Sequence, residues 1–181
     1  MHIHLVWHLI HDRHAWSTKG HPAIVRQSFS RGIRVSALAA FNYSGFCGWK
    51  FTRDTFTRQS FHTAFTECIL PCLNRYPLPN SIVVIDNARI HMYRELQSAV
   101  ESRGALLFFL PPYSPQLNPI ETGFALLKTW IQRHCSEIFR FFPEQCLDIA
   151  CRNCIIKEDA GVNLIQHSGY GFNQVDFMRW G

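Results

Sequence analysis

The most informative stretch of the chain begins Ser81-Ile-Val-Val-Ile-Asp86-Asn-Ala-Arg-Ile-His91 and ends Leu110-Pro-Pro-Tyr-Ser-Pro115-Gln-Leu-Asn-Pro-Ile-Glu121. Asp86 follows an apolar run that predicts a strand, and Glu121 opens a predicted helix, with 34 residues between them. Magnesium prefers carboxylate and water oxygens as ligands, and an enzyme that acts on phosphodiesters needs such ligands to converge from different elements. The stretch therefore supplies two candidate metal ligands.

The same stretch predicts a strand, a helix and a second strand in succession. Ile82–Ile85 and Leu106–Phe109 are continuous apolar runs, which are typical of strands buried on both faces. Met92–Arg103 has the spacing of an amphipathic helix, with Met92 and Leu96 among its inward positions. A strand, helix and strand within about 30 residues predict a parallel pair with a right-handed crossover. Beyond it, Asn118 is expected to cap a helix that runs to about Cys135.

Working outward, the remaining elements complete a mixed sheet flanked by helices. The patterns predict an antiparallel hairpin, a helix capped by Thr57 and a final helix. Their expected ranges are Ile33–Ala40 with Phe46–Thr52, Thr57–Leu73 and Pro143–Lys157.

Composition favours one globular domain of 181 residues, with 47% apolar and 17% charged side chains. No apolar run of about 18 residues exists, so no membrane span is expected. The first ten residues are too polar for the core of a secretory signal. Seven cysteines without such a signal indicate reduced thiols in an intracellular protein. The net charge of +5 is compatible with a polyanionic partner.

Two cysteine pairs and a histidine-rich start leave a zinc-binding module open as a third hypothesis. A zinc site usually needs two pairs of matching spacing, which Cys68–Cys72 and Cys151–Cys154 do not provide. Cys151 and Cys154 instead share a helical apolar face with Leu147 and Ala150, which favours core packing. The five histidines within residues 1–14 either bind a transition metal or are ordinary sequence.

The central stretch resembles the catalytic domain of mariner-type DDE transposases, the DDE superfamily endonuclease domain. The likeness rests on Val-Ile-Asp86-Asn-Ala-x-x-His91, on Leu110-Pro-Pro-Tyr-Ser-Pro115-x-Leu-Asn-Pro-Ile-Glu121, and on Leu-Leu-Lys128-x-Trp after it. The 34-residue gap is also the family's spacing. Weaker likeness covers most of the chain, at Trp16–Gly20, Arg31–Ser36, Phe61–Pro79 and His167–Tyr170.

The resemblance implies an α/β fold with an RNase H-like mixed sheet, an antiparallel hairpin plus parallel strands flanked by helices. It implies that Asp86 and Glu121 hold Mg²⁺ or Mn²⁺ and catalyse DNA strand cleavage and transfer by in-line displacement. Asn87 and His91 match motif positions and are assigned supporting roles, and Lys128 is a candidate phosphate contact. DNA is the expected partner, a homodimer is compatible with the sequence, and a nuclear location follows if the source is eukaryotic.

Three departures from the family pattern bear on activity. The family's first Asp, at the end of the first strand, would fall at Met1 when counted back from Trp16. Its role would fall to Asp12, the one early candidate in the sequence, or to a residue upstream of Met1. Phe124 stands where the family has a tryptophan, and no room exists for a helix-turn-helix region. We therefore expect residues 1–181 to form a single N-terminally truncated domain with an incomplete first strand and impaired catalysis.

The residue types alone also have structural explanations. An Asp after a strand often caps a turn, and a Glu in a first helical turn interacts favourably with the helix dipole. The alternative to an impaired nuclease is therefore a non-catalytic domesticated or remnant domain that binds DNA or protein.

Overall fold

The computed structural model describes residues 2–7, 19–20, 35–154 and 165–170. None of the helices in these ranges has the length and apolar character needed to cross a membrane. The strands are β1 (His2–Trp7), β2 (Val35–Asn42), β3 (Gly45–Thr52), β4 (Ile82–Ile85) and β5 (Leu106–Phe109). The helices are α1 (Arg58–Ala64), η1 (Phe65–Ile69), η2 (Leu70–Cys72), α2 (Arg94–Ser102), η3 (Pro115–Leu117), α3 (Ile120–His134) and α4 (Pro143–Asn153).

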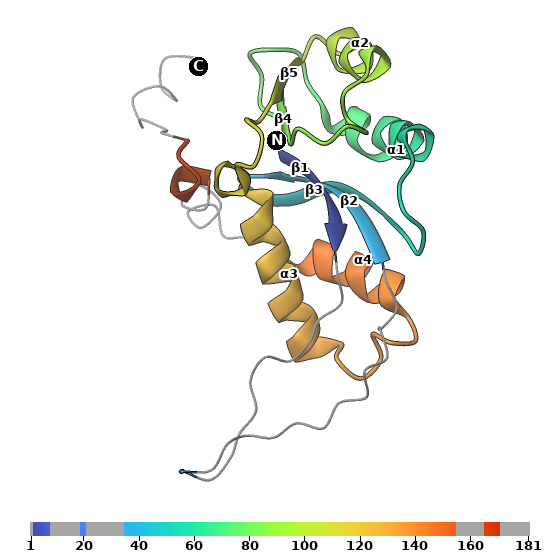
Figure 1. Cartoon of the computed structure of the whole chain (residues 1–181), viewed down its shortest axis with the longest axis vertical. Coiled ribbons are helices and arrows are strands. Elements are labelled where there is room, and N and C mark those ends of the chain that lie inside the picture. The colour runs from blue at the N-terminus through green and yellow to red at the C-terminus, as the bar shows by residue number, and fades with distance from the viewer. Residues whose placement is uncertain (1, 8–18, 21–34, 155–164, 171–181) are drawn as a thin grey trace.

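The strands form one mixed sheet in the order β3-β2-β1-β4-β5. β1 pairs antiparallel with β2, and β2 pairs antiparallel with β3. On the other side β1, β4 and β5 are parallel neighbours. The predicted antiparallel hairpin and parallel pair are thus confirmed, and Figure 1 shows helices on both sides of the sheet that they share.

β1 is the central strand of the sheet. The sequence predicts an incomplete first strand. β1 has six residues, of which His2, Ile3, His4, Leu5 and Trp7 pair with β2. Pairing with β4 is recorded at two positions, His2 with Val84 and Ile3 with Ile85. The alternating but histidine-rich start of the chain is compatible with a strand. It forms one because it pairs with its two neighbours, β2 and β4.

Two cores lie on opposite faces of the sheet because side chains alternate along each strand. In β2 the residues Val35, Ala37, Ala39 and Phe41 belong to the core under α3 and α4. Leu38 and Ala40 belong to the core under α1, η1 and α2. β2 is therefore buried on both faces, and the sheet lies between two helical layers that position the strand ends.

β5 is an edge strand, and the expectation that Leu106–Phe109 is buried on both faces is wrong. Leu106, Phe108 and Phe109 are 39%, 53% and 42% exposed. The helices α3 and α4 contact chiefly β1, β2 and β3, so they do not extend over β5. Ile82 of β4 is also exposed, whereas Val83, Val84 and Ile85 are buried as predicted.

The predicted helix Thr57–Leu73 is divided into three pieces. Thr57 caps α1 as expected, with its hydroxyl accepting from the Ser60 amide in a capping box. The chain then continues as the π-helix η1 and the 3₁₀-helix η2, which contains Pro71. Proline lacks the amide that a further helical hydrogen bond needs, and η2 ends one residue after Pro71, at Cys72.

The other helices begin close to their expected positions. α2 starts at Arg94, and Met92 lies before it with half of its surface exposed, so its predicted inward position is wrong. The Ile120 amide donates to Oδ1 of Asn118, which confirms the predicted cap of α3. α4 ends at Asn153, and residues 155–157 of its expected range lie outside the described residues.

Candidate active site

Two carboxylates arrive at one edge of the sheet from different elements. β4 ends at Ile85, so Asp86 follows directly at the carboxyl end of a parallel strand, where ligands gather in open α/β sheets. Its Oδ1 accepts a hydrogen bond from the Ala88 amide at 3.2 Å, which fixes a tight turn. Glu121 is the second residue of α3, and the proline-rich turn after β5 leads into it. The Leu110 amide donates to the Ile85 carbonyl at 2.8 Å, so the turn starts beside Asp86.

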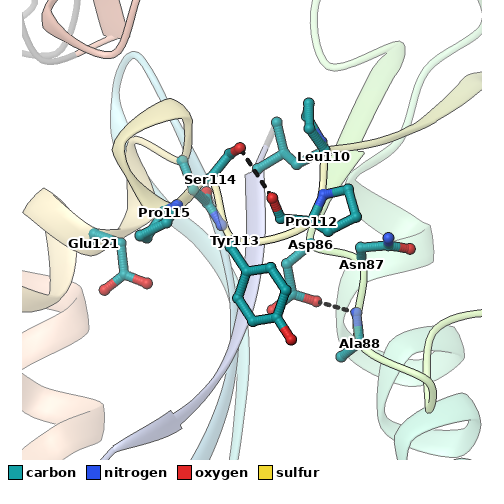
Figure 2. A pocket seen from close by; sticks show the side chains of 11 residues that line it. Asp86, Asn87, Ala88, Leu110, Pro112, Tyr113, Ser114, Pro115 and Glu121 are labelled. Atoms are coloured by element: carbon teal, nitrogen blue, oxygen red, sulfur yellow. Dashed lines mark hydrogen bonds between the residues drawn. The ribbon is translucent and has the colours of Figure 1, made fainter.

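A cavity of about 380 Å³ lies between these elements. Figure 2 shows Asp86 and Asn87 on one side of it, Glu121 on the other, and the Tyr113 ring between the two carboxylates in this view. The structure therefore brings the two predicted metal ligands together on one cavity. Its lining consists of Asp86, Asn87, Ala88, Leu110, Pro111, Pro112, Tyr113, Ser114, Pro115, Asn118 and Glu121.

His91 lies behind Asp86, on the side of the core. Its Nδ1 is 2.6 Å from Oδ1 of Asp86, which is an ion-pair distance, although the direction of approach falls outside hydrogen-bond geometry. The imidazole is fully buried, and its ring centroid lies 4.6 Å from that of Phe61. Asp86 is partly exposed, at 27% of its side chain. A buried ring thus braces a carboxylate that faces the cavity.

The other predicted residues occupy distinct places. Asn87 lines the cavity, and its Oδ1 is buried without a hydrogen-bond partner among the described residues. Lys128 is partly exposed on α3, seven residues beyond Glu121, and is outside the cavity lining. Phe124 is buried against Phe46, with ring centroids 6.0 Å apart. Met1 and Asp12 lie outside the described residues.

The predicted metal ligands in the described part of the chain are two carboxylates, Asp86 and Glu121. No group of three or more His, Cys, Asp or Glu side chains that could hold a metal occurs there. β1, with the sequence His-Ile-His-Leu-Val-Trp, contains no acidic residue. Magnesium is commonly held by one or two carboxylates together with water and substrate phosphates. Asp86 and Glu121 therefore fit a divalent cation as a minimal oxygen donor set.

Two residues at the site were missed by sequence reasoning. Tyr113 lines the cavity and is fully exposed, with a φ of 56°. Tyr170 donates from its hydroxyl to the Leu117 carbonyl at 2.8 Å, which connects the 165–170 segment to the turn before Glu121. Both lie in segments that resemble the family. This resemblance was the feature of the sequence that could have identified them as site residues.

The cysteine pairs belong to the packing of the fold. All seven cysteines lie in the described residues, and they form no disulfide. Cys151 is buried in the core with Leu147 and Ala150, as predicted. Cys154 is partly buried and packs against the same core. Cys47, Cys68 and Cys72 lie at the contact of β3 with η1 and η2.

A family model described as DDE superfamily endonuclease matches residues 9–140. No curated protein matches the chain. The described residues therefore include the whole second half of the matched region, with Asp86, the proline-rich turn and Glu121.

Solved structures of intasome and Mos1 complexes contain chains that are similar to this chain in fold. A chain of the simian T-cell lymphotropic virus intasome in complex with PP2A regulatory subunit B56 gamma has a TM-score of 0.52 and 16% identity, covering 71% of this chain and 48% of that chain. The Mos1 Strand Transfer Complex has a TM-score of 0.50 and 14% identity, covering 95% and 54%. The Mos1 mariner paired end complex with Mn has a TM-score of 0.46 and 15% identity, covering 94% and 55%. The chain thus spans about half the length of these chains.

Proposed function

The chain belongs to the DDE superfamily endonuclease family, and on that premise we propose that it is a transposase-derived domain of the metal-dependent type that cleaves and transfers DNA strands. One observation carries the proposal. Asp86 and Glu121 come from a strand end and a helix start with 34 residues between them, and they line the same cavity. Convergence of hard oxygen ligands at a sheet edge is what metal-assisted phosphodiester chemistry requires.

In the proposed site Asp86 and Glu121 would hold Mg²⁺ or Mn²⁺. When bound, such a cation activates water or a hydroxyl group and stabilises charge on the phosphoryl oxygens. The remainder of a small cation's coordination shell is ordinarily completed by water and substrate phosphate. Mn appears in the name of one Mos1 complex similar to this chain, and the same choice of cation is proposed here.

The chain's own side chains would supply orientation. Asp86 is braced by the buried His91, so its carboxylate is held toward the cavity. Asn87 follows Asp86 at the wall and offers an amide to water or a phosphate oxygen. Lys128 and the net charge of +5 would attract the DNA backbone. These are the supporting and phosphate-contact roles that the motifs predict.

We further propose that strand cleavage is impaired in this chain. The described residues offer two carboxylates to the site, and β1 contributes no acidic side chain. Positioning is most of metal-assisted catalysis, and a cation held by fewer ligands is bound more weakly and placed less accurately. Asp12 is the one early residue proposed to supply a further carboxylate.

Incubation with supercoiled plasmid DNA and Mn²⁺ tests the proposed chemistry. We expect slow or undetectable nicking by the wild-type protein. Fast nicking that disappears in Asp86→Ala and Glu121→Ala, but persists in the surface control Asp54→Ala, would contradict the impairment and support an intact active site. In that case Asp12→Ala shows whether Asp12 completes it.

The alternative is a non-catalytic remnant that binds DNA or protein, and the two-carboxylate ligand set favours it over a fully active nuclease. Titration calorimetry with Mn²⁺ separates the two functions. Heat of binding that Asp86→Ala and Glu121→Ala abolish supports the metal site. Absence of Mn²⁺ binding by the wild-type protein supports the remnant and contradicts the nuclease.

A further inference from the structure

Tyr113 is an aromatic side chain that the fold leaves entirely in solvent. Its side chain is 100% exposed, whereas the next most exposed large hydrophobic residue among those described, Phe141, is 62% exposed. It nevertheless lines the cavity that holds Asp86 and Glu121. In Figure 2 the ring projects from the proline-rich turn between the two carboxylates. Burial in the core therefore does not explain its position.

The backbone at Tyr113 is held in a conformation that a non-glycine residue rarely adopts. Its φ is 56°, in the left-handed region. Pro111 and Pro112 precede it and Pro115 follows, and each proline fixes its own φ. The Ser114 hydroxyl donates to the Pro112 carbonyl at 3.3 Å, across the turn. The turn thus has little freedom, and it directs the ring outward at the rim of the cavity.

Strained backbone persists where the surrounding structure determines it, and it concentrates at ligand-binding sites. An exposed aromatic ring offers a flat apolar face, and the flat apolar surface that nucleic acid offers is the face of a base. In intact duplex DNA these faces are covered by neighbouring base pairs. An unpaired base is available to the ring only where the strand is frayed, nicked or single-stranded, and an intact duplex offers only the outer face of its last base pair.

We propose that Tyr113 is a stacking platform for an unpaired nucleobase next to the phosphate that a cation at Asp86 and Glu121 would hold. The inference rests on the proposed function, because the phosphate of that nucleotide must lie in the cavity. It names the substrate feature that this site recognises, which is DNA with a single-stranded segment at the reacting position. The exposed prolines beside Tyr113 would border the sugar of the same nucleotide.

The test compares two fluorescently labelled duplexes that differ in one feature, a blunt end or a short single-stranded 3′ overhang. Binding is measured by fluorescence anisotropy in the presence of Mg²⁺. We expect the wild-type protein to bind the overhang duplex more tightly than the blunt one. Tyr113→Ala should lose about tenfold in affinity for the overhang duplex, the size of one base–aromatic stacking interaction, and clearly less for the blunt duplex.

Two variants serve as matched controls. Tyr113→Phe keeps the ring and should retain the overhang preference. Tyr76→Ala removes another exposed tyrosine that does not line the cavity, and it should behave as wild type. A 2-aminopurine base in the overhang gives a second readout, because stacking on Tyr113 or Phe should quench its fluorescence and Tyr113→Ala should not.

The outcomes separate this inference from the proposed function. Equal overhang affinity of the wild-type protein and Tyr113→Ala overturns the stacking role while leaving the metal site intact. The wild-type protein could also prefer the overhang duplex and yet fail to bind Mn²⁺ at Asp86 and Glu121. That result contradicts the proposed chemistry and supports the stacking role. Failure of the wild-type protein to bind either duplex overturns both.

Discussion

The Nδ1 atom of His91 lies 2.6 Å from Oδ1 of Asp86, at the point where β4 delivers this carboxylate to the cavity. The imidazole is fully buried and lies against the Phe61 ring. The orientation of a surface carboxylate is therefore tied to the core between the sheet and α1. Residues behind metal ligands commonly fix ligand geometry in this way.

Replacement of His91 by Phe should weaken cation binding without emptying the core. Phe preserves a ring against Phe61 but removes the nitrogen that faces Asp86. Loss of such a partner typically lowers metal affinity about 10–100-fold. Titration calorimetry with Mn²⁺ measures the change, with His134→Phe, a substitution at the exposed end of α3, as the control. Unchanged affinity in His91→Phe would show that Asp86 does not need the brace.

Gly48 allows β3 and η1 to approach closely. A Cβ atom at this position would lie 2.3 Å from the Cys68 carbonyl oxygen, which is backbone and cannot turn aside. Gly48→Ala should therefore lower the free energy of unfolding by about 1–3 kcal/mol, the usual cost of overpacking. Urea denaturation measures it.

Gly123→Ala is the matched comparison for Gly48→Ala. Its Cβ would meet ring atoms of Phe41 at 3.0 Å, and a side chain can shift by a few tenths of an ångström. Alanine also favours the helix over glycine by up to about 1 kcal/mol. We expect a change in the free energy of unfolding near zero. Equal destabilisation by the two substitutions would contradict the close contact at Gly48.

Cys72 should be the most reactive thiol at neutral pH. A hydrogen bond from the Cys47 thiol lowers the pKa of Cys72 to about 7, against an opposing effect of burial. The same interaction raises the pKa of Cys47. Because the thiolate is the nucleophile, alkylation of Cys72 by iodoacetamide should rise through a midpoint near pH 7.

Mass spectrometry of alkylated protein across a pH series checks the Cys72 prediction. Cys47→Ala should move the midpoint upward toward the ordinary value for a thiol. Cys154, whose pKa burial raises, serves as the internal reference and should react more slowly. Alkylation of Cys72 and Cys154 with the same pH profile would disprove the assigned hydrogen bond.

Asp148 connects α4 to β3 and should give a small acid-dependent contribution to stability. Hydrogen bonds from Arg152, and to a lesser degree from the Trp49 indole, lower the pKa of this carboxyl. A lowered pKa stabilises the folded state above the ordinary pKa, and the contribution is lost as pH falls through the folded-state pKa. The pair is largely exposed, so the contribution is at most about 1 kcal/mol.

Asp148→Asn tests the acid dependence. Urea unfolding at neutral pH should show a modest loss of stability in the variant, and the difference should shrink as the pH falls below the ordinary carboxyl pKa and through the lowered folded-state pKa of Asp148. A difference of the same size at both pH values would mean that charge is not the cause.

The sequence predicts the strands around the site well because their signals are local. Ile82–Ile85 and Leu106–Phe109 coincide with β4 and β5, and the capping residues Thr57 and Asn118 begin helices as expected. The burial of β5 could not be predicted in the same way. Both apolar runs look alike, and only the strand order makes one internal and the other an edge.

The site shows the same division between local and long-range information. The motif and its spacing single out Asp86 and Glu121, and the structure places both on one cavity. The contact of His91 with Asp86 and the exposure of Tyr113 depend on how distant segments pack, which no spacing rule contains. The change to a π-helix after Ala64 had no signal in the sequence pattern, whereas Pro71 was a local signal for the end of the helical segment in η2.

The hydrogen bond from Tyr170 to Leu117 couples the carboxyl-terminal part of the protein to the entrance of α3. A fragment shortened to end before residue 165 would keep every side chain of the cavity lining but would lose this hydrogen bond. Such trimming would loosen the position of Glu121 without altering the motif that contains Asp86 and Glu121. Weak DNA cleavage by such a fragment would therefore say little about how well the untrimmed chain cleaves DNA.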